Sequence, residues 1–109
     1  MQKKPAAEIE KLIEEITVDC NNEDEQLTAF ELTINDAIHG QAKAYHLGVP
    51  VHIVDVNSNQ GLYAGLRAKI TRQRKTLEVS LLDLKIDRAE EEELYRVVEA
   101  YKYFVKNLG

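Results

Sequence analysis

The amino-acid sequence predicts a single α+β domain, residues 1–109, in which two N-terminal helices and a C-terminal helix pack against a small, strongly bent antiparallel sheet. Three observations favour this fold class. Apolar residues recur at helical spacing over residues 5–38, alternate with polar residues in the middle of the chain, and return to helical spacing after residue 87. The length of 109 residues, with 44% hydrophobic and 30% charged residues, is typical of one globular domain.

The first predicted helix covers residues 5–15, because Pro5 suits a first helical turn. Its apolar face is formed by Ile9, Leu12, Ile13 and Ile16. The β-branched residues 16–18 offer an alternative, a short extended link after the helix.

A second amphipathic helix is predicted over residues 23–38. Asn22 is a suitable N-cap and Glu25 a capping-box partner, while Gly40 is a plausible stop. The buried face of this helix comprises Leu27, Phe30, Ile34 and Ile38.

The middle of the chain, residues 42–86, is rich in strand signals. A β-rich run, residues 51–56, ends in the turn cluster 57–61. Residues 66–71 and 76–81 alternate apolar and polar side chains around the turn residues 72–75, so they predict a hairpin with one buried face. Four or five such strands suggest a curled sheet or an SH3-like barrel.

The last predicted helix lies within residues 87–109, with Asp87 as its cap and Glu90 as the capping partner. Its buried face comprises Leu94, Val97, Val98, Tyr101, Val105 and Leu108. Tyr103 lies off this face, where it can serve a partner surface. The predicted core of the domain is Leu12, Ile16, Leu27, Phe30, Ile34, Ile53, Leu66, Ile70, Leu77, Val79, Leu81, Val98 and Tyr101.

Charge is unevenly distributed along the chain. The whole chain carries a net charge of -5, but residues 1–41 carry ten acids against three lysines, and residues 42–86 carry seven bases against three acids. An acidic helix lying near a basic hairpin would explain this pattern by internal complementarity. The alternative is a cation site on the first segment or an anion site on the second.

Composition excludes several classes of protein. An excess of acidic over basic residues disfavours a general nucleic-acid binder, without excluding a local one. No apolar run approaches the ~20 residues of a membrane span, and residues 1–5 lack the apolar stretch of a secretory signal. The single cysteine, Cys20, excludes an internal disulfide, so a reducing, cytoplasmic location is expected. The sequence leaves the oligomeric state open.

The acidic turn around residues 19–25 is the first candidate site. Calcium takes six to eight oxygen ligands, and a turn rich in Asp and Asn can supply several. The spacing is not that of an EF-hand, because Asp24 and Phe30 occupy the positions of the required glycine and glutamate. The alternative role of these acids is helix capping and solubility.

A basic hairpin is the second candidate site, able to bind RNA or a protein partner through clustered cations. Its residues are Arg67, Lys69, Arg72, Arg74 and Lys75. The alternative role of these charges is to blunt an exposed strand edge against aggregation. Nothing in the spacing of Cys20, the histidines or the serines predicts a catalytic constellation, so we expect no enzyme.

Several segments resemble the small CcbP-like calcium-binding proteins first recognised in cyanobacteria. A β-like segment containing Val18-Asp19 leads into the acidic helix start Glu23-Asp24-Glu25-Gln26, and residues 47–51, 65–68 and 79–84 resemble the strand-rich half of these proteins. Residues 100–104 are similar to their closing helix. The resemblance covers most of the chain from residue 16.

This resemblance implies a non-enzymatic calcium-binding protein, of a buffering or signalling type, that uses surface carboxylates without EF-hands. The matching acids are Asp19, Glu23, Asp24, Glu25 and Asp36. The modest net charge and the basic middle depart from what a calcium buffer would show. An interaction module that binds RNA or a protein partner through the basic hairpin is the alternative function.

Overall fold

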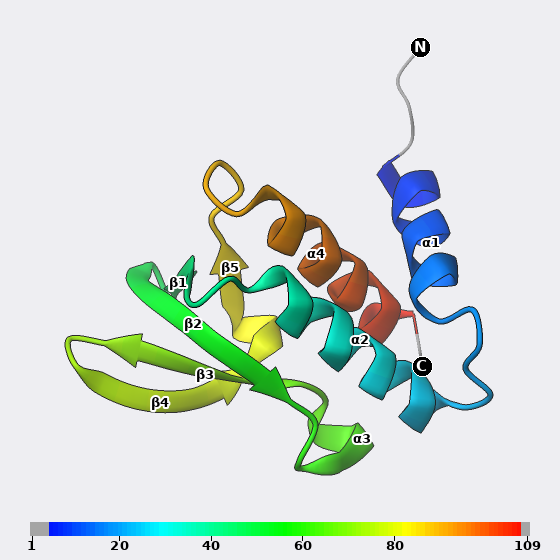
Figure 1. Ribbon diagram of the computed structural model, residues 1–109, viewed down its shortest axis with the longest axis horizontal. Coiled ribbons are helices and arrows are strands. Elements are labelled where there is room, and N and C mark those ends of the chain that lie inside the picture. Colours follow the sequence, from blue (N-terminus) through cyan, green and yellow to red (C-terminus); the bar gives the residue numbers. More distant parts are fainter. Residues whose placement is uncertain (1–4, 108–109) are drawn as a thin grey trace.

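A computed structural model describes residues 5–107 and confirms the predicted α+β class (Figure 1). None of the helices in this range is both long and apolar enough to cross a membrane. In chain order the elements are α1 (Pro5–Ile16), α2 (Glu23–Ala37), β1 (Ala42–His46), β2 (Val49–Asn57), α3 (Gly61–Ala64), β3 (Arg67–Arg72), β4 (Lys75–Ser80), the 3-10 helix η1 (Leu81–Asp83), β5 (Leu84–Ile86) and α4 (Glu92–Lys106).

The five strands form one antiparallel sheet in the order β4-β3-β2-β1-β5, so β4 and β5 are its edge strands. Helices α2 and α4 pack side by side next to the sheet, and α1 packs mainly against α4 (Figure 1). The predicted hairpin is β3–β4, but its turn is shorter than expected. Only Gln73 and Arg74 lie outside the strands, and both have positive φ, as a type I′ turn requires.

The core lies between the sheet and the α2–α4 pair. Its fully buried large side chains are Phe30, Ile34, Ile53, Leu66, Ile70, Leu81, Leu84, Leu94, Val98 and Tyr101. Leu12, Ile16 and Val79 pack against this core while partly exposed. The prediction of Leu77 as a core residue is wrong, because its side chain is 45% exposed. Leu77 lies on the edge strand β4, where no further strand flanks it, whereas its partner Ile70 on β3 is fully buried.

The N-terminal half agrees closely with its local signals. Helix α1 continues through Ile16, and the Thr17 backbone N–H still donates to the Ile13 carbonyl, so residues 16–18 are no extended link. Asn22 caps α2 as predicted, accepting from the Glu25 backbone N–H at 2.9 Å. The Glu25 carboxylate accepts from the Asn21 backbone N–H, one residue before the expected capping-box donor.

The C-terminal helix begins later than predicted, at Glu92 rather than near Asp87. The Asp87 carboxylate instead accepts from the backbone N–H groups of Ala89 and Glu90, which closes a separate turn. The predicted buried face is confirmed through Tyr101, and Leu108 lies outside the described residues. Helix α3, four residues long, was not predicted, because the sequence reads there as a turn cluster.

Side-chain hydrogen bonds tie the helices to the strand-rich part of the chain. The Asn35 side chain of α2 donates to the Val56 carbonyl at 3.0 Å and accepts from the Val56 N–H at 2.9 Å. This pair lies beside the irregularity that interrupts the β2–β3 register between Ile53 and Asp55. The Tyr101 hydroxyl of α4 accepts from the Leu66 N–H at 2.9 Å, just before β3.

Candidate functional site

The acidic turn between α1 and α2, residues 17–22 together with the first turn of α2, presents the predicted carboxylates to solvent. Asp19, Glu23, Asp24 and Glu25 are all exposed. Glu25 has a structural task, because its carboxylate accepts from Asn21 and so holds the turn against the helix. No hydrogen bond or ion pair within residues 5–107 engages the carboxylates of Asp19, Glu23 and Asp24.

The electrostatic surroundings of this turn favour a cation. Residues 12–41 contain eight acids and neither lysine nor arginine. The positive end of the α2 dipole opposes a bound cation, but it amounts to only about half an elementary charge. Four carboxylates within seven residues outweigh it, so the net field attracts cations.

The five predicted ligands do not form one group. Asp36 lies in the last turn of α2, twelve residues after Asp24. At 1.5 Å rise per residue, about 18 Å of helix separates them. Among residues 5–107, no three His, Cys, Asp or Glu side chains are arranged as they would be around a metal ion. The turn carboxylates therefore need to rotate before they can share one.

The basic hairpin divides into a paired part and an unpaired part. The Arg67 Nε atom lies 3.6 Å from the Glu78 carboxylate, and Lys69 Nζ lies 4.0 Å from the Asp55 carboxylate. These two cations are thus balanced within the sheet. Arg72, Arg74 and Lys75 at the tip are exposed, and none of them forms an ion pair with a described residue.

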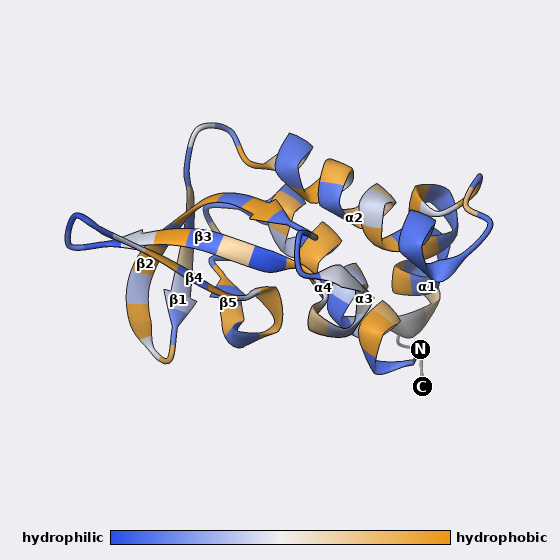
Figure 2. Cartoon of the chain, turned by 90° about the horizontal axis from the view of Figure 1, so that it is seen from below, coloured by the Kyte–Doolittle hydropathy of each residue, from blue (hydrophilic) through white to orange (hydrophobic). Residues whose placement is uncertain are grey.

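The acidic turn and the basic tip lie at opposite ends of the molecule (Figures 1 and 2). The molecule measures 39 Å along its longest axis, well beyond the Debye length of about 8 Å in physiological salt. The acidic turn and the basic tip therefore do not neutralise each other. Arg67 and Lys69 find their acids on neighbouring strands instead.

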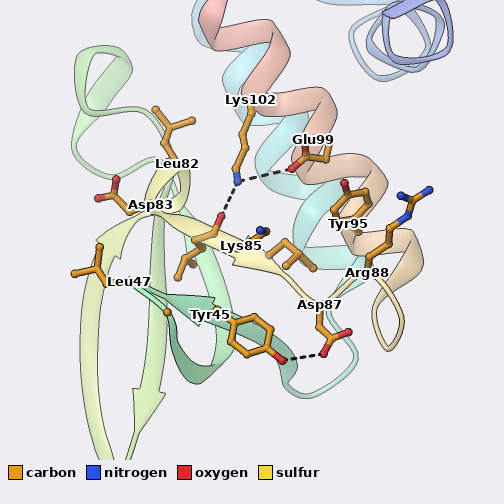
Figure 3. A pocket seen from close by; sticks show the side chains of 13 residues that line it. Tyr45, Leu47, Leu82, Asp83, Lys85, Asp87, Arg88, Tyr95, Glu99 and Lys102 are labelled. Atoms are coloured by element: carbon orange, nitrogen blue, oxygen red, sulfur yellow. Dashed lines mark hydrogen bonds and ion pairs between the residues drawn. The ribbon is translucent and has the colours of Figure 1, made fainter. Parts of the chain in front are cut away.

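An open groove between β5 and α4 was not predicted from the sequence (Figure 3). Exposed apolar side chains of Tyr45, Leu47 and Leu82 stand at its rim. Lys102 crosses it, donating from Nζ to the Leu84 carbonyl and lying 3.7 Å from the Glu99 carboxylate. The residues that line this groove come from separate segments of the chain, so no local sequence pattern predicts the groove.

Several of the charged side chains that line the groove have partners within it. The Tyr45 hydroxyl donates to the Asp87 carboxylate at 3.4 Å, and the Arg88 guanidinium lies 5.3 Å from the Tyr95 ring centroid. Tyr103, which stays a candidate for a partner surface, is half-buried, and its hydroxyl donates to the Glu10 carboxylate of α1 at 2.8 Å. This hydrogen bond to a carboxylate raises the pKa of Tyr103.

No protein-family model matches the chain, and no curated protein matches its sequence. Two solved structures are similar to it. The crystal structure of Anabaena CcbP aligns over 96% of this chain and 93% of its own, with a TM-score of 0.74 and 11% sequence identity. The chain shares the fold of Anabaena CcbP. A structure described as a calcium-binding protein in its calcium-binding form aligns over 91% and 90%, with a TM-score of 0.72 and 11% identity.

The similarity to CcbP confirms, for the fold, the resemblance that the sequence segments indicated. It extends over nearly the whole of both chains, so the helices and the sheet correspond in arrangement. At 11% identity the likeness concerns the fold, and the ligands must be argued from the residues of this chain.

Proposed function

We propose that the protein binds calcium ions without catalysing a reaction, as a buffering or signalling protein, through the carboxylates of the acidic turn. The fold shared with two calcium-binding proteins supports the choice of ion. The observation that supports the location is the presence of three exposed, unpaired carboxylates on one short turn, those of Asp19, Glu23 and Asp24.

The donor chemistry of the turn suits a hard cation. Three carboxylates offer six oxygens, and calcium prefers six to eight oxygen ligands at 2.3–2.6 Å. Backbone carbonyls, the Asn21 side chain and water complete the shell. Glu25 stays in its capping role, and Asp36 stays outside the site because of its distance along α2.

The affinity of such a site is set by two opposing effects. Clustered negative charge strengthens binding of the ion. The carboxylates are exposed and do not already converge, so ordering them costs conformational entropy and weakens binding. We therefore expect a dissociation constant in the micromolar to millimolar range, on the order of sensors and extracellular modules rather than tight buffers.

A calcium titration followed by amide chemical shifts tests this proposal, in near-physiological salt with millimolar magnesium present. We expect saturable shifts confined to residues 17–25. Asp24→Asn and Glu23→Gln should each weaken binding about tenfold, since loss of a charge-assisted contact is worth about 1.5 kcal/mol. Asp36→Asn and Glu92→Gln remove the same charge elsewhere and serve as controls.

The possible results test separately whether calcium binds and whether it binds at the acidic turn. Saturable shifts centred on another segment, or equal weakening by the control variants, would remove the acidic turn from the proposal. Shifts that never saturate would mean charge screening alone, and calcium binding would then be rejected for this chain.

A further inference from the structure

The outer side of β4 has no strand partner, since β3 is its only neighbour in the sheet. The two-residue turn makes Arg72 and Lys75 a hydrogen-bonded ladder pair. The alternation of an antiparallel ladder then directs the backbone groups of Thr76, Glu78 and Ser80 away from β3. The Leu81 N–H donates to the Leu66 carbonyl at 3.0 Å, which agrees with odd-numbered residues directing their backbone groups toward β3.

The side chains beside this open edge form a distinct surface at the hairpin tip. Leu77 lies opposite the buried Ile70, so it belongs to the face of the sheet that carries the core, yet it is 45% exposed. Lys75, two residues earlier, lies on that same face, directly opposite Arg72. Directly opposed side chains have Cβ atoms about 5 Å apart, so two like charges repel there.

Neither Arg72 nor Lys75 forms an ion pair with any residue in the range 5–107. An edge strand with unpaired backbone groups, an exposed leucine and two uncompensated cations is complementary to an extended segment that carries an acid beside an apolar residue. The acid would relieve the Arg72–Lys75 repulsion, which nothing in the described chain relieves.

We propose that the outer edge of β4 binds an extended acidic segment of another protein by strand addition. The added strand runs antiparallel to β4, with an apolar residue opposite Leu77 and an acidic residue two positions later, opposite Lys75. Its backbone pairs with the outward groups of Thr76 and Glu78. The contact at Glu78 has one competitor, the Arg67 guanidinium, which donates to the Glu78 carbonyl at a long 3.4 Å.

Other occupants of this edge fit less well. In a second copy paired antiparallel about Leu77, Lys75 would meet Val79, and the cations would gain no counter-charge. Single-stranded RNA would find phosphate partners but no aromatic platform at the tip. The exposed Tyr63 precedes β3, at its far end, about 17 Å of strand away from the turn.

The test uses the full chain and a fluorescein-labelled peptide, Thr-Ile-Thr-Val-Thr-Asp-Thr, followed by fluorescence anisotropy in the presence of EDTA. We expect saturable binding that weakens as salt increases. EDTA removes calcium, so the result does not depend on the proposed calcium site. In chemical-shift mapping, the peptide should perturb residues 75–80 and leave the acidic turn unaffected.

Matched variants identify the two kinds of contact. Lys75→Gln should raise the dissociation constant about two- to fivefold, the range of an exposed ion pair, whereas Lys69→Gln should leave it unchanged. Replacing the peptide's aspartate by lysine should weaken binding to the native chain more than Lys75→Gln does, and Lys75→Glu should restore binding of the lysine peptide. A proline between the valine and the aspartate removes the N–H that pairs with Thr76, so that peptide should not bind.

Absence of binding at millimolar peptide would overturn the proposal. So would unchanged binding of the proline peptide, because strand addition requires that backbone group. If an oligouridylate binds more tightly than the peptide and displaces it, the tip is a phosphate site and the proposal is also rejected.

Discussion

Gly65 occupies a position where a side chain has no room. Its φ is +67°, and a Cβ atom there would lie 2.6 Å from the Tyr101 hydroxyl oxygen. That hydroxyl cannot move away freely, because Tyr101 is 1% exposed and packs edge-on against Phe30 with ring centroids 5.6 Å apart. The same hydroxyl accepts the Leu66 N–H, so displacing it also breaks a buried hydrogen bond.

These contacts set the expected cost of Gly65→Ala. The left-handed backbone conformation costs alanine about 1 kcal/mol, and leaving the buried Leu66 N–H unpaired costs about 2 kcal/mol. The free energy of unfolding should therefore fall by about 3 kcal/mol. Gly48→Ala is the matched control: φ is +81° there, but nothing lies within 4 Å of the added Cβ, so only the backbone cost of about 1 kcal/mol applies.

A double-mutant cycle with Tyr101→Phe isolates the clash. Phenylalanine removes the hydroxyl, which costs about 2 kcal/mol through Leu66 but opens space for the alanine methyl group. In that background Gly65→Ala should cost only about 1 kcal/mol. Urea denaturation of the native chain, both single variants and the double variant should give a coupling energy of about 2 kcal/mol. Energies that add to within about 0.5 kcal/mol would refute the clash.

Three further predictions concern the core and its polar contacts. Burial raises the pKa of Tyr101 above 10.0, so this hydroxyl ionises at a lower pH in the unfolded chain than in the folded one. The free energy of unfolding should therefore fall as pH rises past 10.0, and it should fall less steeply in Tyr101→Phe. Asn35→Ala should lower the free energy of unfolding by about 2 kcal/mol, because it leaves both backbone groups of Val56 unpaired. Leu77→Ala should cost less than about 1 kcal/mol, whereas Ile70→Ala should cost about 3 kcal/mol.

Urea denaturation measures all three, with the first repeated between pH 8 and 11. An identical pH dependence in the native chain and Tyr101→Phe would contradict the first. A loss below about 0.5 kcal/mol for Asn35→Ala would mean that water replaces the side chain at Val56. If Leu77→Ala and Ile70→Ala lowered the free energy of unfolding equally, the difference in burial between the two side chains would be contradicted.

Local signals determined much of this protein. The apolar spacing of α1 and α2, the Asn22 cap and the alternation of β3 and β4 were predicted from the sequence, because neighbouring residues decide these features. The separation of Asp36 from the acidic turn also follows from the predicted helix, through its rise per residue. The capping role of Glu25 was predicted as well, although it accepts from Asn21.

Contacts between distant segments decided the rest. Alternation placed Leu77 on the apolar face, but its place on the edge strand leaves it exposed, while its partner Ile70 is fully buried. Asp87 has a capping pattern, yet its carboxylate closes a turn before the helix begins. The sequence by itself determined that the charges are segregated along the chain. Tertiary structure alone placed the acidic turn and the basic tip at opposite ends, because sequence order does not determine distance once the chain folds back on itself.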